Sequence, residues 1–263
     1  MQRILRAVLC AVAATCCLSA PAAGQERSIR IRDFGARLIV ASDGSLDVTE
    51  HLVVGFSGQW NGIVRDLSLR HRTAEGRPAR LDVDIVSITD GAGQSFRVEE
   101  ERKDNGWTRA LRIWVPGASD ADREVVIRYR VANAIRFFYA GSAAGELDEL
   151  YWNVTGNAWT MPIDKAHARV VLPGGVTATR TAVYTGATGS VAADATIQRS
   201  KNEVDFTLQR GLSPYEGMTI GVGWPAGHIA SRPGEARRRL ASMQWWSPFV
   251  LPFGSVVQPE TLS

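Results

Sequence analysis

Glu50 is the residue whose type and position most directly suggest chemistry. Every second residue from Leu46 to Phe56 is apolar except Glu50, which places its carboxyl group on the apolar side of an alternating strand, with Val48 and Leu52. A carboxylate in an apolar layer needs a partner of opposite charge or a raised pKa, because desolvation disfavours the charged form. A carboxyl group perturbed in this way is a candidate functional group.

Arg65 is the expected partner of Glu50. Gly58 and Gly62 lie between the two residues and allow the chain to turn back toward the strand that carries the carboxyl group. Buried ion pairs of this kind also occur where they only fix strand geometry. The two interpretations are a perturbed carboxylate at a functional site and a structural ion pair. We favour the structural ion pair of Glu50 and Arg65.

A second candidate is a ligand-binding site made of acidic, aromatic and amide side chains. Its residues are Asp148, Glu149, Tyr151, Trp152, Asn153 and Trp159. Aromatic rings beside carboxyl groups are typical of sugar-binding clefts, in which rings stack on the sugar and two acids act as general acid and base. Neighbouring residues in a strand point to opposite faces, however, so Asp148 and Glu149 are poorly placed to flank one glycosidic bond. We therefore predict ligand binding here and assign no catalytic residue.

The rest of the sequence offers no pattern for a metal, nucleotide or redox site. The four histidines, which include His51 and His167 on the outward side of expected strands, are not at metal-ligand spacing. The glycines mark turns between strands rather than a phosphate-binding loop. The three cysteines, Cys10, Cys16 and Cys17, all lie close to the N-terminus. We expect no metal and no cofactor.

The first 24 residues have the pattern of a secretory signal peptide. Arg3 and Arg6 precede an apolar run from Ala7 to Leu18, and small residues at 20–24 offer a cleavage site. The run is shorter than the roughly 20 residues that span a bilayer, and an uncleaved anchor is the alternative. Without Arg3 and Arg6 the formal net charge falls from +3 to +1, which does not indicate nucleic-acid binding. We expect export to the periplasm or the extracytoplasmic face of a bacterial membrane.

Period-two alternation of apolar residues predicts the fold. It occurs at residues 36–41, 46–56, 81–85, 111–115, 125–131, 168–172, 204–208 and 218–224, with Gly-rich and Pro-containing turns between the stretches. We predict an all-β domain over residues 28–225, an antiparallel β-sandwich with immunoglobulin-like packing, and consider two sandwich halves that meet near residue 140 as an alternative arrangement. Residues 226–263 are expected to form a linker, a short basic helix and an apolar segment, Trp245 to Val257, that is too short to span a bilayer as a helix.

Three segments resemble one protein family in the order in which that family has them. The run from Leu147 to Ile163, with Tyr-Trp-Asn-Val-Thr-Gly at its centre, is similar to the signature of the DUF2207 family of predicted membrane proteins. Gly44 to Glu50 is similar to an early hairpin of the family, and Asn61 to Leu67 to its Gly-Ile-x-Arg turn. The resemblance implies an exported β-rich domain followed by transmembrane helices, and it implies no activity. This chain is expected to be a truncated member or a naturally short form.

These observations favour a non-enzymatic binding or interaction module in the cell envelope. Its expected partner is an envelope protein or a cell-wall component, with membrane association through the signal or the C-terminal tail. The alternative function is a hydrolase of envelope polysaccharide that uses acidic residues near the Tyr-Trp-Asn-Val-Thr-Gly run. Fold class alone does not decide between them, since sandwiches host many unrelated functions.

Overall fold

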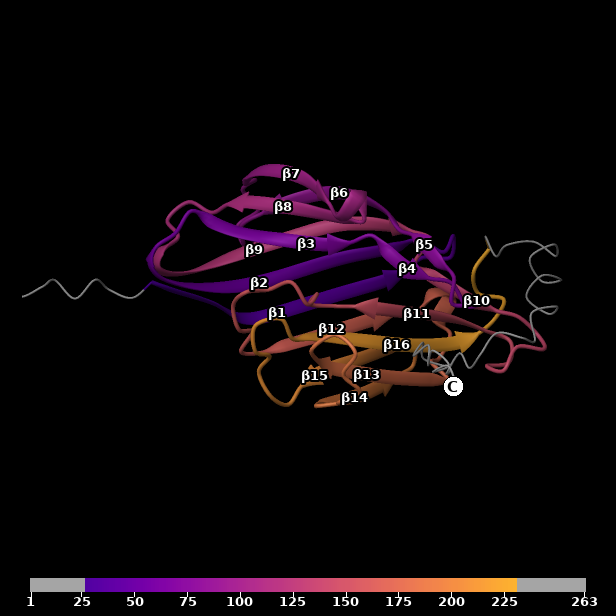
Figure 1. Ribbon diagram of the computed structural model, residues 1–263. Coiled ribbons are helices and arrows are strands. Elements are labelled where there is room, and N and C mark those ends of the chain that lie inside the picture. The colour runs from indigo at the N-terminus through magenta and orange to yellow at the C-terminus, as the bar shows by residue number, and fades with distance from the viewer. Residues whose placement is uncertain (1–26, 231–263) are drawn as a thin grey trace, which may run out of the picture.

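The computed structural model describes residues 27–230, which form an all-β assembly of sixteen strands (Figure 1). Two short 3-10 turns, Asp104–Gly106 and Pro173–Gly175, complete the regular structure of this part of the chain. The prediction of an all-β fold is confirmed. The expected signal peptide, and the expected basic helix and apolar segment beyond residue 230, lie outside the described residues. Within residues 27–230, no helix has the length and apolarity needed to cross a membrane.

The strands vary widely in length, and the longest are β1, β2 and β9. Their bounds are β1 Ser28–Val40, β2 Leu46–Gln59, β3 Gly62–Ser68, β4 Arg70–Arg72, β5 Pro78–Arg80, β6 Asp82–Thr89, β7 Arg97–Lys103, β8 Thr108–Trp114, β9 Ser119–Ala132, β10 Ile135–Phe138, β11 Leu147–Asn153, β12 Ala166–Val171, β13 Arg180–Gly186, β14 Ala195–Ser200, β15 Glu203–Leu208 and β16 Gly217–Pro225. All eight stretches with period-two alternation lie wholly or largely within strands of this set.

One seven-stranded sheet, in the order β14-β15-β12-β1-β2-β9-β6, runs through the whole domain. Its β1–β2 hairpin turns at Asp43 and Gly44, and Gly44 adopts the positive φ that the tight turn requires. Most pairs are antiparallel, but β1 pairs with β12 in parallel. This parallel pair joins a strand from the first half of the chain to one from the second half, so both halves share the sheet.

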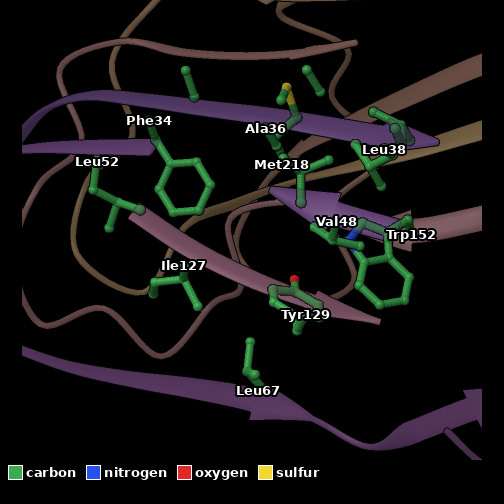
Figure 2. Close-up of a cluster of buried hydrophobic side chains, with 14 of the residues drawn as sticks. Phe34, Ala36, Leu38, Val48, Leu52, Leu67, Ile127, Tyr129, Trp152 and Met218 are labelled. Atoms are coloured by element: carbon green, nitrogen blue, oxygen red, sulfur yellow. The ribbon is translucent and has the colours of Figure 1, made fainter. Parts of the chain in front are cut away.

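Two smaller sheets form the other layer. The three-stranded sheet β3-β8-β7 lies beside β2, β9 and β6, and the four-stranded sheet β10-β11-β16-β13 lies beside β12, β15 and β14 (Figure 1). Side chains from all three sheets meet in one apolar core. Figure 2 shows Phe34, Leu52 and Ile127 of the large sheet with Leu67 of β3 and Met218 of β16. Burial of this shared apolar surface is the main force that holds the layers together.

The connection between β2 and β3 brings the chain back over the large sheet. Gly62, which begins β3, has a φ of 148° and packs so closely on the backbone of Ile113 that a Cβ atom there would collide with the Ile113 carbonyl oxygen. Only glycine fits such a position. The glycine in this turn therefore allows the close pairing of β3 with β8, which sets Arg65 over Glu50.

Candidate functional site

The Glu50 carboxylate is enclosed between the layers and accepts hydrogen bonds from two side chains. Arg65 donates from Nε to Oε2 at 2.9 Å and from Nη2 to Oε1 at 2.7 Å. The Tyr129 hydroxyl donates to Oε1 at 2.7 Å. Glu50 is 0% exposed and Arg65 is 3% exposed. The structure thus brings together the two residues that the sequence paired, in a two-pronged geometry that strengthens a buried ion pair.

Arg65 also connects the two sheets of the second layer. Its Nη1 donates to the carbonyl oxygen of Thr155 at 2.7 Å, and its Nη2 donates to that of Val154 at 3.2 Å, just beyond the end of β11. The guanidinium carbon lies 5.5 Å from the centre of the Phe34 ring and 5.6 Å from that of the Trp159 ring. One side chain from β3 therefore contacts the large sheet and the four-stranded sheet at the same point.

Burial and neighbouring charges shift the pKa values of Arg65 and Tyr129 in this cluster. Burial disfavours a charged Arg65, but the Glu50 carboxylate outweighs burial and raises the pKa of Arg65 above its ordinary value. Burial, together with the same carboxylate, raises the pKa of the Tyr129 hydroxyl well above its ordinary value. Tyr129 therefore stays a hydrogen-bond donor, and Arg65 stays charged. This arrangement suits a structural pair rather than a proton-transfer site.

A second buried ion pair lies on the four-stranded sheet. The β10–β11 register sets Arg136 opposite Glu149, and Arg136 Nη1 donates to Glu149 Oε2 at 3.2 Å. Arg136 Nε also donates to the carbonyl oxygen of Arg72 in β4 at 2.9 Å, and its guanidinium stacks 4.2 Å from the centre of the Tyr151 ring. This pair thus fixes the β4–β5 hairpin against β10 and orients Tyr151.

The ionisable groups of this second cluster have shifted pKa values. Burial raises the pKa of Glu149 to about 7, although Arg136 and Arg180 favour its charged form. Glu149 Oε1 is buried and accepts no hydrogen bond from the described residues. Burial, and then the charge of Arg136, lowers the pKa of His71 to about 4. Burial also lowers the pKa of Arg136. Sequence reasoning missed His71 and Arg136, because neither stands near a recognisable motif.

The predicted ligand-binding residues are divided between the two faces of β11. Asp148 and Trp152 share the core-facing side with Leu150, whereas Glu149 and Tyr151 lie on the opposite side. Asn153, on the same side as Tyr151, accepts a hydrogen bond from Gly156 N at 3.0 Å. Trp159 lies in the Arg65 cluster, where its Nε1 donates to the Thr155 carbonyl oxygen at 2.7 Å. The six side chains therefore do not converge on one point.

Three of the six predicted ligand-binding residues line a common cleft of about 560 Å³ between β3 and β11. Tyr151, Trp152 and Asn153 form its β11 side, and Leu67 and Ser68 belong to its β3 side. A second cavity, of about 690 Å³, lies farther along β3. We name the two together the β3 groove. The residues predicted from the sequence that line this groove are Tyr151, Trp152, Asn153, Trp159 and Arg65.

No metal site is formed by the part of the chain that the structure describes. Residues 27–230 contain no group of three or more His, Cys, Asp or Glu side chains close enough to share a metal ion. His51 and His167 are exposed and lie beside single carboxylates: His51 Nε2 is 3.0 Å from Glu124, and His167 Nδ1 is 3.3 Å from Asp33. The charged lining of the β3 groove consists of arginines and Lys103 with two acids, Asp66 and Asp104.

Comparison with known proteins gives a family. The sequence matches the N-terminal domain of the predicted membrane proteins called DUF2207 over residues 30–224. The chain belongs to the DUF2207 family. It is 30% identical over 148 residues to the uncharacterised protein YciQ of Escherichia coli strain K12, a match that covers 53% of this chain and 21% of YciQ. The matched part thus spans about a fifth of that relative's length.

Solved structures share strands with the DUF2207 domain only distantly. Leukotriene A4 hydrolase from Saccharomyces cerevisiae in complex with bestatin gives a TM-score of 0.49 at 10% identity, with 74% of this chain and 29% of that chain covered. An M1 zinc metallopeptidase from Deinococcus radiodurans gives a TM-score of 0.41 at 15% identity, with 82% and 53% covered. At these scores the likeness bears on neither activity nor ligand.

Proposed function

We propose that this DUF2207 domain is an exported, non-enzymatic binding module of the cell envelope that holds its ligand in the β3 groove. The observation that carries the proposal is the state of the buried carboxylates. Glu50 accepts three hydrogen bonds inside the core, and Glu149 is paired with Arg136. Neither carboxylate lines the groove, whose own acids are Asp66, paired with Lys103, and Asp104, so it offers a ligand mainly arginines, rings and amides.

The lining of the groove suits recognition of a polar chain. Trp152 and Leu67 form apolar surface near its base, while Asn153, Asn157 and Arg70 supply hydrogen-bonding groups around it. Ligand sites commonly combine apolar walls with a few placed polar groups in a cavity of this size. Tyr151 is held by the Arg136 guanidinium and needs no reorganisation to contact a ligand.

One observation favours the alternative function, a polysaccharide hydrolase. Glu149 has a pKa of about 7, which is suited to a general acid. A glycosidase of the usual kind needs a second carboxyl group across the sugar, about 5–10 Å away. The neighbouring acid, Asp148, lies on the other side of β11, with Leu150 and Trp152. Binding without hydrolysis therefore remains the better explanation of the geometry.

A photo-crosslinking residue at the groove tests both functions in the full chain. Thr188 lines the groove and is exposed, and Val191, 78% exposed, serves as the control position outside it. We expect adducts with an envelope component from position 188, their loss when Tyr151→Ala is added, and none from position 191. Adducts from both positions, or from neither, contradict a groove-specific ligand.

The full chain is also incubated with purified peptidoglycan, and time-dependent release of sugar fragments that Glu149→Gln abolishes would establish the hydrolase instead.

A further inference from the structure

The strand β3 has one free edge. Among the strands of residues 27–230, it forms the end of the sheet β3-β8-β7 and pairs only with β8. Hydrogen bonds from Leu69 N to the Trp107 carbonyl and from Val115 N to the Asn61 carbonyl fix which residues bond across the β3–β8 ladder. Because the direction of backbone groups alternates along an antiparallel strand, Val64, Asp66 and Ser68 direct their amides and carbonyls away from β8.

A second strand edge faces β3 across the groove. Val154 N donates to the Met218 carbonyl, which fixes the β11–β16 ladder and turns the backbone groups of Tyr151 and Asn153 away from β16. On the side of β11 that faces away from β16, β10 pairs with β11 only as far as Leu150. The last part of β11 therefore presents unpaired backbone groups toward the three-stranded sheet.

The groove follows β3 along its length. The 690 Å³ cavity is lined by residues 62–64 of β3, and the 560 Å³ cavity by residues 65–68. The two cavities share Asp66 and Ala158 as lining residues. A seven-residue strand extends about 23 Å, which is the length of a typical strand-forming peptide. An extended chain laid in the groove would thus meet the backbone groups of Val64 and Ser68 and the amide of Asp66, while the Asp66 carbonyl oxygen already accepts a hydrogen bond from Arg65 Nη1 at 3.4 Å.

We propose that the ligand of the β3 groove is an extended polypeptide segment that adds to the free edge of β3 as a further strand. This inference rests on the proposed binding function and names its ligand class. In strand addition, backbone hydrogen bonds supply affinity, and pockets for alternate side chains supply specificity. The main chain of a glycan has no amides and carbonyls at the spacing of a β-strand to match the β3 edge, so the strand edge favours the polypeptide.

The charges of the groove define the chemistry of that segment. Its lining holds seven cationic residues, Arg27, Arg65, Arg70, Arg72, Lys103, Arg112 and Arg136, against the acids Asp66 and Asp104. Three of the cations are paired with carboxylates, in Arg65–Glu50, Lys103–Asp66 and Arg136–Glu149. The other four have no ion pair with any described residue. A bound segment therefore carries acidic side chains toward the arginines.

The buried side chains at the base of the groove include apolar ones beside Arg65, His71 and Arg136, and the apolar ones set the pattern of the segment. Leu67 and Trp152 come from the two facing edges, and Leu81, Val83 and Tyr129 line the same cavity. Successive side chains of a strand point to opposite faces. The segment therefore alternates apolar residues, directed at this base, with acidic residues, directed at the rim.

Val64→Pro tests strand addition directly. Proline removes an amide that faces the groove but leaves the β3–β8 ladder intact, because proline is tolerated on an open edge. Val64→Ala keeps the amide, and Arg102→Pro places a proline on β7, the opposite edge of the same sheet. The probe is a fluorescent peptide of about eight alternating Val and Glu residues, with an N-methylated copy and a Val–Lys copy as comparisons.

Strand addition predicts that Val64→Pro and N-methylation each weaken binding of the Val–Glu peptide to the full chain by about tenfold or more, from lost backbone hydrogen bonds. Arg102→Pro should stay within about twofold, Val64→Ala should weaken binding less than Val64→Pro because it keeps the amide, and the Val–Lys peptide should bind more weakly. Unchanged binding by Val64→Pro and by the N-methylated peptide overturns the inference. Failure of every peptide, with retained binding of soluble peptidoglycan fragments, overturns the inference but leaves the proposed function standing. If neither binds and position 188 gives no adducts, both fail.

Discussion

The Arg65 guanidinium lies 2.7 Å from the carbonyl oxygen of Thr155, a residue 90 positions farther along the chain. The same guanidinium holds Glu50 in the large sheet. Arg65 is therefore the point at which the three-stranded and four-stranded sheets are tied to the layer beneath them. The β3 groove opens on either side of this tie, so the ion pair sets the separation of the two strand edges that line it.

Glu50→Gln should lower the free energy of unfolding by about 3–5 kcal/mol, because the Arg65 charge remains buried without its partner. Unfolding in urea, followed by tryptophan fluorescence, measures the change. Glu124→Gln removes the exposed partner of His51 and is the matched control, expected to change stability by less than about 0.5–1 kcal/mol. An effect of Glu50→Gln no larger than that of the control would contradict the structural role.

Tyr129→Phe should cost less than the loss of the ion pair. It removes the hydroxyl that donates to Glu50 Oε1 but keeps the buried ring, so we expect a loss of about 1.5–3 kcal/mol, typical of a hydrogen bond to a charged group. In a double-mutant cycle, Tyr129→Phe and Glu50→Gln should be non-additive, because both act on one carboxylate. Additive losses would indicate that the hydroxyl does not act through Glu50.

The sequence predicts most of the fold because most strands have one buried and one less buried face. In β2 the burial alternates along Leu46–Glu50, and the apolar pattern alternates with it. The strand β11 is not among the eight alternating stretches, since residues 147–150 are buried on both faces and show no period-two pattern. The parallel β1–β12 pair was not predicted either, because alternation does not reveal which distant strands pair.

The two ion pairs differ in how far the sequence predicts them. Glu50 and Arg65 are 15 residues apart on consecutive strands, so an apolar-side carboxylate and two turn glycines were enough to pair them. Arg136, by contrast, bonds to the Arg72 carbonyl 64 residues away in a short hairpin. Its contact depends on how β4 and β5 fold over β10, which local patterns do not specify. Glu149 was identified as a site residue, but its partner was not.

The mature N-terminus tests the predicted export. We expect the protein expressed in bacterial cells to begin near Gln25 by mass spectrometry, as cleavage of a signal of 24 residues requires. Release by an alkaline carbonate wash should accompany this cleavage and would direct the search to diffusible ligands. An intact N-terminus beginning at Met1, with protein retained in the washed membrane, would contradict cleavage and support the uncleaved anchor.

Glu149 and His71 should give opposite pH dependences of stability. The pKa of Glu149 is about 7 in the folded protein and 4.5 as an isolated group. Its folded form binds more protons between these values, so stability falls as pH rises from about 4.5 to 7. The pKa of His71 is about 4 in the folded protein and 6.5 as an isolated group. The unfolded form then binds more protons, so stability rises with pH between about 4 and 6.5.

The two effects oppose each other between about pH 4.5 and 6.5, which makes the single variants informative. Relative to wild type, Glu149→Gln should remove the falling contribution, so that stability rises more steeply with pH in this window. His71→Asn should remove the rising contribution and leave stability to fall from about pH 4.5 to 7. Urea unfolding at intervals of pH measures each slope. His167→Asn, a change at an exposed histidine beside Asp33, is the control for replacing a histidine with asparagine. If both cluster variants keep the wild-type slope, neither group is perturbed as the structure implies.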